Sequence, residues 1–204
     1  MPADVEIIPE PATRLADYAR IPIAFEVTHR LSVDPAGPSS DGISLRLERQ
    51  DPPYVKDYDA IDGCHPTQWP ERHDVSDWWI ASAWQEAERV GGVVVAFDAE
   101  LAGMRDAGDN AAAVLWDLRV APGRRRRGVG ARLFGAAIQH AREQGSQRLL
   151  IETQNTNVTA CRFYAAQGCT LVHVEAHAYP LFPNEVRLVW AKELGGSPRD
   201  CSVV

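Results

Sequence analysis

Leu118-Arg-Val-Ala-Pro-Gly-Arg-Arg-Arg-Arg-Gly-Val-Gly-Ala131 is the most informative stretch of this chain. Its pattern predicts the end of a strand, then a basic turn with glycines, then the start of a helix. Free main-chain N–H groups at a helix start bind anions, the helix dipole adds to the attraction, and glycines let a phosphate approach the backbone. We therefore predict a phosphate site here. The stretch lacks the Gly-Lys-Ser/Thr ending of a P-loop and the third glycine of a Rossmann fingerprint.

Periodic segments flank this turn on both sides. A strand is expected at Ala113 to Val120 before it. After it, apolar residues recur at helical spacing on one face that ends at Gly145, namely Val129, Leu133, Ala137 and Ala141. The pattern then predicts a strand (Arg148–Thr153), a helix capped by Asn157 (Asn157–Gln167), and two strands (Thr170–Ala178 and Glu185–Lys192). This order predicts an α/β (α+β) fold with a mixed sheet.

The first third of the chain is less regular. Two strands, Phe25–Val33 and Ile43–Arg49, are expected on either side of a turn-rich loop at Asp34–Gly42. The proline-rich stretch from Asp51 to Asp77 is expected to be mostly irregular.

The stretch from residue 78 to residue 97 has two interpretations. Trp78 to Val90 has the periodicity of a helix. The same residues also fit a hairpin, with strands at Trp78–Trp84 and Val90–Phe97. The adjacent Gly91-Gly92 and the β-favouring Val93 to Val95 support the hairpin.

Composition limits the class of protein. The chain has 204 residues with 21 Lys+Arg and 28 Asp+Glu, a net charge of −7, and removing Arg124 to Arg127 would lower it to −11. This length suits one domain, which we expect at residues 1–193, with 1–77 least defined and a flexible tail at 194–204. A negative surface disfavours binding to nucleic acid and to anionic membranes.

The four cysteines form no C-x-x-C pair and are expected to be reduced. With no signal peptide or membrane span evident, we expect a cytoplasmic protein.

Arg125-x-x-Gly128-x-Gly130 resembles the R/Q-x-x-G-x-G/A loop of the GNAT N-acetyltransferase superfamily. Two surrounding patterns agree with this resemblance: Leu118-x-Val120-x-Pro122, and Asn157-x-x-Ala160-x-x-Phe163-Tyr164-x-x-x-Gly168. Within the superfamily, the run from Ile151 to Cys169 and the segment Pro53-Tyr-Val-Lys-Asp-Tyr-Asp59 are most similar to the streptothricin acetyltransferase group. The resemblance implies a mixed, mostly antiparallel twisted sheet flanked by helices and splayed at its two central strands.

The resemblance also implies acetyl-CoA as co-substrate and assigns residues to it. Main-chain groups of Leu118, Arg119 and Val120 would pair with the pantetheine arm as an added strand does. Asn157 would contact the same arm, and Tyr164 would donate a proton to the leaving CoA thiolate. The remaining cofactor-binding residues form the loop, with its amides around the pyrophosphate: Arg125, Arg126, Arg127, Gly128, Val129, Gly130 and Ala131.

The candidate residues of the acceptor-binding site are carboxylates and one tryptophan. The acceptor amine must lose a proton before it attacks, and Asp117 and Glu152 are the two candidates for the base, acting directly or through water. The residues expected to hold a cationic acceptor are Asp57, Asp59, Glu175 and Trp116. His173 and His177 share one face of a predicted strand, but no third ligand accompanies them, so no metal site is expected.

The resemblance implies an enzyme that transfers an acetyl group directly from acetyl-CoA to a primary amine in a ternary complex. A small polycationic acceptor such as a streptothricin-like antibiotic is the narrower expectation, and a polyamine or amino metabolite is the wider one. The alternatives are a protein or peptide N-acetyltransferase and a non-catalytic acyl-CoA-binding module. A homodimer is left open.

Overall fold

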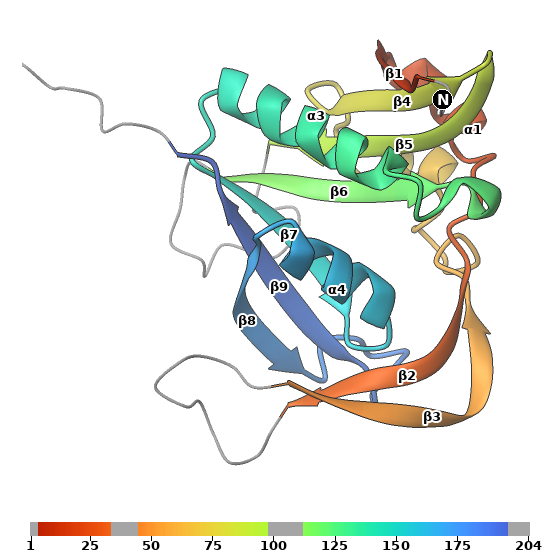
Figure 1. Ribbon diagram of the computed structural model, residues 1–204, viewed down its shortest axis with the longest axis vertical. Helices are drawn as coiled ribbons and strands as arrows, with labels where there is room; N and C mark the ends of the chain where they lie inside the picture. The colour runs from red at the N-terminus through yellow and green to blue at the C-terminus, as the bar shows by residue number, and fades with distance from the viewer. Residues whose placement is uncertain (1–3, 34–44, 98–111, 196–204) are drawn as a thin grey trace, which may run out of the picture.

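Two β-sheets are present in the computed structural model, which describes residues 4–33, 45–97 and 112–195 (Figure 1). Within these residues the larger sheet has the strand order β1-β4-β5-β6-β7-β9-β8, and only the pair β6 and β7 is parallel. Its strands are β1 (Glu6–Glu10), β4 (Trp79–Gln85), β5 (Glu88–Ala96), β6 (Ala112–Val120), β7 (Arg148–Gln154), β8 (Thr170–Ala176) and β9 (Val186–Glu193). The smaller sheet pairs β2 (Phe25–Val33) with β3 (Leu45–Lys56) in antiparallel fashion.

Helices lie on both faces of the larger sheet. The apolar sides of α3 (Val129–Glu143) and α4 (Val158–Ala166) are buried in one cluster with Val93 and Val95. The short helices α1 (Leu15–Tyr18) and α2 (Trp69–Arg72) pack in another cluster with Val94. Since alternate residues of a strand face opposite sides, the two helix pairs cover opposite faces. Short 3-10 helices are η1 (Ala12–Arg14), η2 (Pro66–Gln68) and η4 (Pro122–Arg124).

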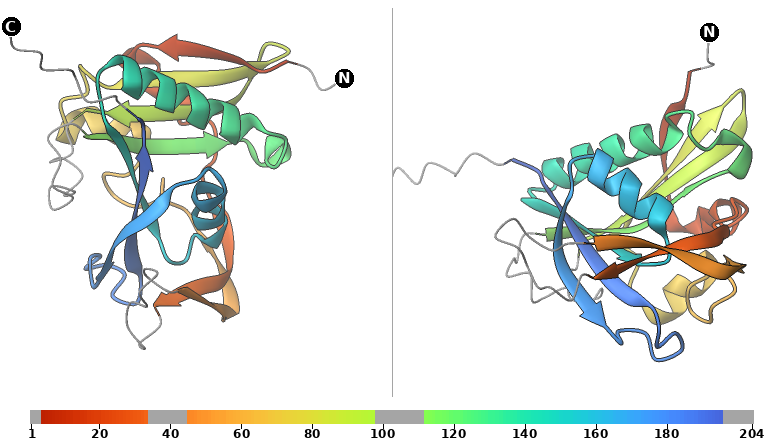
Figure 2. Two further views of the ribbon diagram at one scale, coloured as in Figure 1. Left: turned by 60° about the vertical axis from the view of Figure 1, so that its left-hand side comes forward. Right: turned by 60° about the horizontal axis from the view of Figure 1, so that its bottom comes forward.

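The two central strands, β6 and β7, separate along their length. Their parallel ladder runs from Ala112 opposite Arg148 to Leu115 opposite Ile151, and beyond that point both strands continue without pairing to each other. At the same point β6 bulges against β5, because Val95 pairs with Leu115 whereas Val94 pairs with Asp117. Figures 1 and 2 show the two halves of the sheet diverging from there. The predicted mixed, mostly antiparallel sheet with splayed central strands is therefore confirmed.

Two glycines of β5 allow helices to approach both faces closely. A Cβ atom on Gly91 would lie 2.9 Å from a methyl group of Leu133 in α3. A Cβ atom on Gly92 would lie 2.3 Å from the ring of Tyr18 in α1. Side chains at these positions would displace one helix or the other.

The hairpin interpretation of residues 78–97 is correct, since β4 and β5 pair as antiparallel neighbours. The expectation that 51–77 is irregular is wrong in part. β3 continues to Lys56, and its prolines are accommodated because 50–53 lie in a register shift between the pairs Val27 with Tyr54 and His29 with Arg49.

The other expected elements fall within a few residues of the observed ones. The turn-rich loop at 34–42 and residues 43 and 44 lie outside the described residues. Leu194, expected in the tail, is buried in the core, and its N–H donates to Gln147 O at 2.9 Å. Residues 196–204 lie outside the described part.

The cysteines that the structure describes, Cys64, Cys161 and Cys169, are free thiols, as expected, and Cys201 lies outside the described residues. Over the ranges 4–33, 45–97 and 112–195, no helix combines the length and apolar character needed to cross a membrane.

Candidate active site

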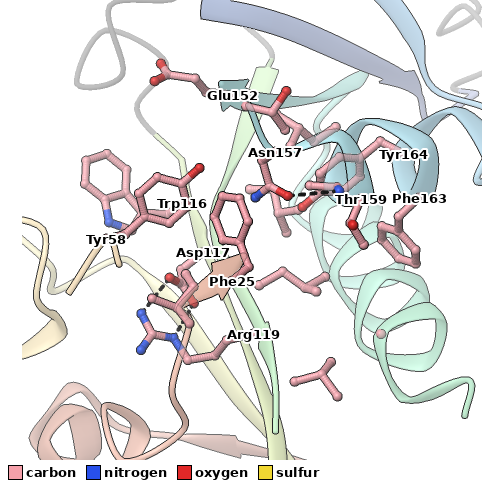
Figure 3. A pocket seen from close by; sticks show the side chains of 18 of the residues that line it. Phe25, Tyr58, Trp116, Asp117, Arg119, Glu152, Asn157, Thr159, Phe163 and Tyr164 are labelled. Atoms are coloured by element: carbon pink, nitrogen blue, oxygen red, sulfur yellow. Dashed lines mark hydrogen bonds and ion pairs between the residues drawn. The ribbon is translucent and has the colours of Figure 1, made fainter. Parts of the chain in front are cut away.

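A cavity of about 920 Å³ lies at the divergence of β6 and β7 (Figure 3). At one end it reaches the loop before α3, where Arg126 and Ala131 line it. The middle is lined by the exposed edge of β6 and by α4, including Tyr164. At the other end Trp69 and Cys64 contribute to the wall. The cavity therefore joins the basic glycine loop to an aromatic pocket.

The loop before α3 presents a row of main-chain donors. Among the described residues, no acceptor pairs with the main-chain N–H groups from Arg126 to Ala131. Arg126 and Gly128 have φ angles of 59° and 85°, in the left-handed region, which turns the chain sharply into the helix. Gly128 is the N-cap and supplies no capping side chain. Unpaired donors at a helix N-terminus are suited to bind an anion, which is the chemistry that the sequence pattern indicates for this loop.

The arginine side chains of this loop differ in their surroundings. Arg125 donates through Nε to Val120 O at 3.0 Å and through its terminal nitrogen to Pro22 O and Ala24 O at 3.3 Å. Arg124 forms an ion pair with Glu88 at 2.7 Å. Arg126 and Arg127 are exposed, whereas Val129 is buried under the helix. Arg125 thus fixes the loop to the end of β6, and the next two arginines face solvent.

Beyond the bulge, the main-chain N–H and C=O groups of successive β6 residues point alternately toward β5 and toward the opening. Ala121 N–H donates to Val90 O on the β5 side, so the main-chain groups of Arg119 also face β5. Those of Leu118 and Val120 then face the opening toward β7. The described structure therefore leaves two of the three expected pantetheine contacts facing the cavity.

Tyr164 and Asn157 come from α4. The Asn157 side chain caps the helix, accepting from Ala160 N–H at 3.1 Å, and the residue also lines the cavity. The Tyr164 ring packs against Phe134 and Phe163. Its phenol has no hydrogen-bond partner among the described residues. Burial is the main cause that raises the pKa of the Tyr164 phenol above its ordinary value, and the negative charge of Asp117 adds to the increase.

Asp117 belongs to a buried ion-pair cluster (Figure 3). Arg119 donates to both Asp117 oxygens at 2.9 and 2.8 Å and to both Asp59 oxygens at 2.9 and 3.2 Å. Tyr18 donates its hydroxyl to Asp117, and its ring lies under the guanidinium. The Arg119 side chain is 1% exposed. This cluster ties α1, β6 and the segment after β3 together, and it occupies both oxygens of Asp117.

Glu152 lies on β7 one residue beyond the last pair with β6, and it lines the cavity. Its Oε1 accepts from the Tyr179 hydroxyl at 2.7 Å, and its Oε2 lies 3.1 Å from Nε of Arg187. Burial raises the pKa of the Glu152 carboxyl, although the Tyr179 hydrogen bond and the Arg187 charge oppose this shift. A carboxylate of this kind, with lone pairs left for a further proton, is suited to act as a base near neutral pH.

The remaining residues expected at the acceptor site are dispersed. Trp116 lines the cavity. Asp59 is held by Arg119, and Asp57 is exposed and accepts from the Asp59 N–H at 3.1 Å. Glu175, on β8, pairs with Arg187 at 3.3 Å. Neither Asp57 nor Glu175 is among the residues that line the cavity.

Two aromatic residues of the pocket were not singled out from the sequence. Phe25 and Tyr58 both line the cavity, and their ring centroids are 5.6 Å apart. Figure 3 shows them on the same side of the cavity as Trp116. The only indication from the sequence that Tyr58 lies near the site was the family resemblance of its segment, Pro53–Asp59. Nothing in the sequence indicated that Phe25 lines the cavity, because it is the first residue of a strand in another sheet.

Within the described ranges, no group of three or more His, Cys, Asp and Glu side chains is arranged to hold a metal ion. His173 and His177, the candidates from the sequence, are both exposed.

A helix start with unpaired amides, next to two parallel strands that separate, is the arrangement found in acetyl-CoA-dependent acetyltransferases. The chain belongs to the acetyltransferase (GNAT) family, whose profile matches residues 47–169. It is 37% identical over 83 residues to streptothricin acetyltransferase A of Bacillus subtilis (strain 168), covering 40% of this chain and 48% of the relative. Over 156 residues it is 27% identical to streptothricin acetyltransferase of Streptomyces lavendulae, covering 76% of each. The first of these matches spans about half the length of that relative.

Solved structures agree on the fold. A Bacillus anthracis str. Ames protein assigned as a streptothricin acetyltransferase, in complex with acetyl coenzyme A, has a TM-score of 0.73 at 25% identity. The match covers 93% of this chain and 99% of that one. Nourseothricin acetyltransferase gives a TM-score of 0.70 at 24% identity, covering 94% of this chain and 99% of that one.

Proposed function

We propose that the protein is an acetyl-CoA-dependent N-acetyltransferase acting on a primary amine of a small cationic acceptor. The observation that carries this proposal is the single cavity that joins the unpaired amides of 126–131 to the carboxylate of Glu152. The first end suits the phosphates of CoA, and the second suits an amine that must lose a proton. Membership of the GNAT family supports the same co-substrate.

The residues present fit acetyl-CoA, which would supply the acetyl thioester. The six amides of the loop would receive the pyrophosphate, with Arg126 and Arg127 adding positive charge. Leu118 and Val120 would offer main-chain groups to the pantetheine arm, and Asn157 would bind it from α4. Arg119 would contribute by positioning rather than by contact, since its side chain and main chain are both engaged elsewhere.

Two side chains would carry the proton transfers. Glu152 would first take one proton from the acceptor ammonium, directly or through one water, which frees the nitrogen lone pair to attack the acetyl carbon. The nitrogen loses its second proton to solvent as the bond from that carbon to sulfur breaks. Tyr164 would give its phenolic proton to the departing thiolate and regain a proton from solvent. Its raised pKa keeps the phenol protonated before this step. Asp117 is the weaker candidate for the base, because Arg119 and Tyr18 already bind its oxygens.

The acceptor end favours a cation with an extended carbon skeleton. Faces of Phe25, Tyr58 and Trp116 would attract the ammonium groups and cover the chain between them. Glu152 would supply the charge nearest the reacting amine. Since two relatives bear the name streptothricin acetyltransferase, we propose streptothricin as the acceptor to test first. We also propose a cytoplasmic location, where acetyl-CoA is made and free thiols stay reduced.

The proposal is tested by CoA release from acetyl-CoA with a panel of acceptors: streptothricin, spermidine, free lysine and a lysine-rich peptide. Acceptor-dependent release with streptothricin or a polyamine supports it. Release with the peptide alone would instead indicate a protein acetyltransferase, and CoA binding without release for any amine would indicate a non-catalytic module.

A further inference from the structure

Tyr179, on the connection between β8 and β9, takes no part in the chemistry proposed above. Its hydroxyl donates to Oε1 of Glu152 at 2.7 Å. The hydroxyl oxygen of Tyr179 accepts from Nε2 of Gln154 at 3.1 Å, and Oε1 of Gln154 accepts from the hydroxyl of Tyr58. Because each donor has a defined acceptor, this series has one direction, from Tyr58 to Glu152.

The segment that carries Tyr179 is fixed at its far end. Glu185 forms an ion pair with Lys56 of β3, at 2.8 and 3.0 Å, and both side chains are buried. The Lys56 ammonium also lies 3.3 Å from the centre of the Phe182 ring. Tyr179 is therefore part of a tethered connection, and its hydroxyl has a defined position.

Charged groups from two other strands also act on Glu152. Arg187 of β9 lies 3.1 Å from Oε2, and Glu175 of β8 lies 3.3 Å from a terminal nitrogen of the same arginine. Burial raises the pKa of Glu152, the Tyr179 hydrogen bond and Arg187 lower it, and Glu175 raises it. Within the described residues, each Glu152 oxygen thus has one partner, which leaves a lone pair on each for the proton of an acceptor.

We infer that Tyr179 is a positioning residue for Glu152, whose hydroxyl holds the carboxylate in one orientation and favours its ionised form. This inference rests on the proposed function, in which Glu152 takes the proton of the amine. A hydrogen bond to a carboxylate stabilises the charged form, so its loss makes the carboxylate harder to ionise. The acidic limb of the turnover profile then moves to higher pH.

The test is the pH dependence of kcat at saturating acetyl-CoA and acceptor in Tyr179→Phe, which removes only the oxygen. We expect the midpoint of the acidic limb to rise by about one pH unit, the effect of one hydrogen bond to a charged group. At one unit below the wild-type midpoint, kcat then falls by about ninefold relative to wild type, whereas the plateau at higher pH changes by less than about threefold. An acidic limb that stays within about 0.2 units of wild type would overturn the inference.

Two variants make the outcome specific. Glu175→Gln removes a negative charge that Glu152 senses, so its acidic limb should move to lower pH, opposite to Tyr179→Phe. A shift of both variants in the same direction would contradict the inference, because it would indicate a general disturbance. Glu152→Gln should remove the acidic limb. If it does and Tyr179→Phe leaves the limb unmoved, only the positioning role fails. If Glu152→Gln keeps full turnover, the proposed base itself is wrong.

Discussion

Replacing Tyr164 by Phe separates the proposed acid from its role in packing. The substitution keeps the ring that contacts Phe134 and Phe163 and removes an oxygen with no hydrogen-bond partner among the described residues. No hydrogen bond is lost, so the free energy of unfolding should change by less than about 0.5 kcal/mol. Loss of a general acid typically costs about 10²- to 10⁴-fold in turnover. At about 1.4 kcal/mol per tenfold, this is about 3 to 6 kcal/mol of activation free energy.

The assay is CoA release followed with a thiol-reactive dye at saturating acceptor, together with the Kd of CoA by calorimetry. We expect kcat to fall by at least about 100-fold while the Kd and the urea midpoint stay near wild type. Burial raises the pKa of the phenol, and an acid is active while protonated. The wild-type rate should therefore show no loss from ionisation of Tyr164 at pH values up to about 10. A variant with unchanged kcat would refute the acid role. A fall in kcat accompanied by a clear fall in the urea midpoint would instead indicate that Tyr164 acts through packing.

Two further predictions concern the loop and the buried cluster. Gly128→Val places a branched side chain at a φ of 85° and should weaken CoA binding by about tenfold or more, measured by calorimetry. Gly135→Ala, at an exposed position in the same helix where a Cβ meets nothing within 4 Å, is its control and should leave binding unchanged. Arg119→Met leaves its two carboxylate partners buried without a cation and should lower the free energy of unfolding by about 3 to 5 kcal/mol in urea. A loss below about 1 kcal/mol would contradict the importance of that cluster.

The sequence was most informative where local chemistry determines structure. Gly128 and the arginines before it predicted the loop, because a helix start with glycines leaves amides unpaired whatever packs around it. The helix face from Val129 to Ala141 followed from periodicity, and the β-propensity of Val93 to Val95 favoured the hairpin at residues 78–97 over a helix. The splay of β6 and β7 followed from the family resemblance.

The acceptor side was harder to predict because distant segments build it. The register shift that lets β3 pass Pro52 and Pro53 cannot be read from prolines, which normally end strands. Asp117 was one of two equal candidates for the base until Arg119, two residues away, was found to hold both its oxygens. Tyr179 lies 27 positions from Glu152 and reaches it only because β7 pairs with β9. Such contacts depend on tertiary structure, which no local pattern encodes.

The most direct test of the proposed function is a product analysis with the purified protein, acetyl-CoA and streptothricin. We expect equal amounts of released CoA and of acceptor carrying one acetyl group on an amine, with initial-rate lines that intersect as a ternary complex requires. The Glu152→Gln and Tyr164→Phe variants should each form this product at least about 100-fold more slowly while still binding CoA. Tight CoA binding with no acetylated product from any amine of the panel would contradict the assignment of this cavity as a catalytic site.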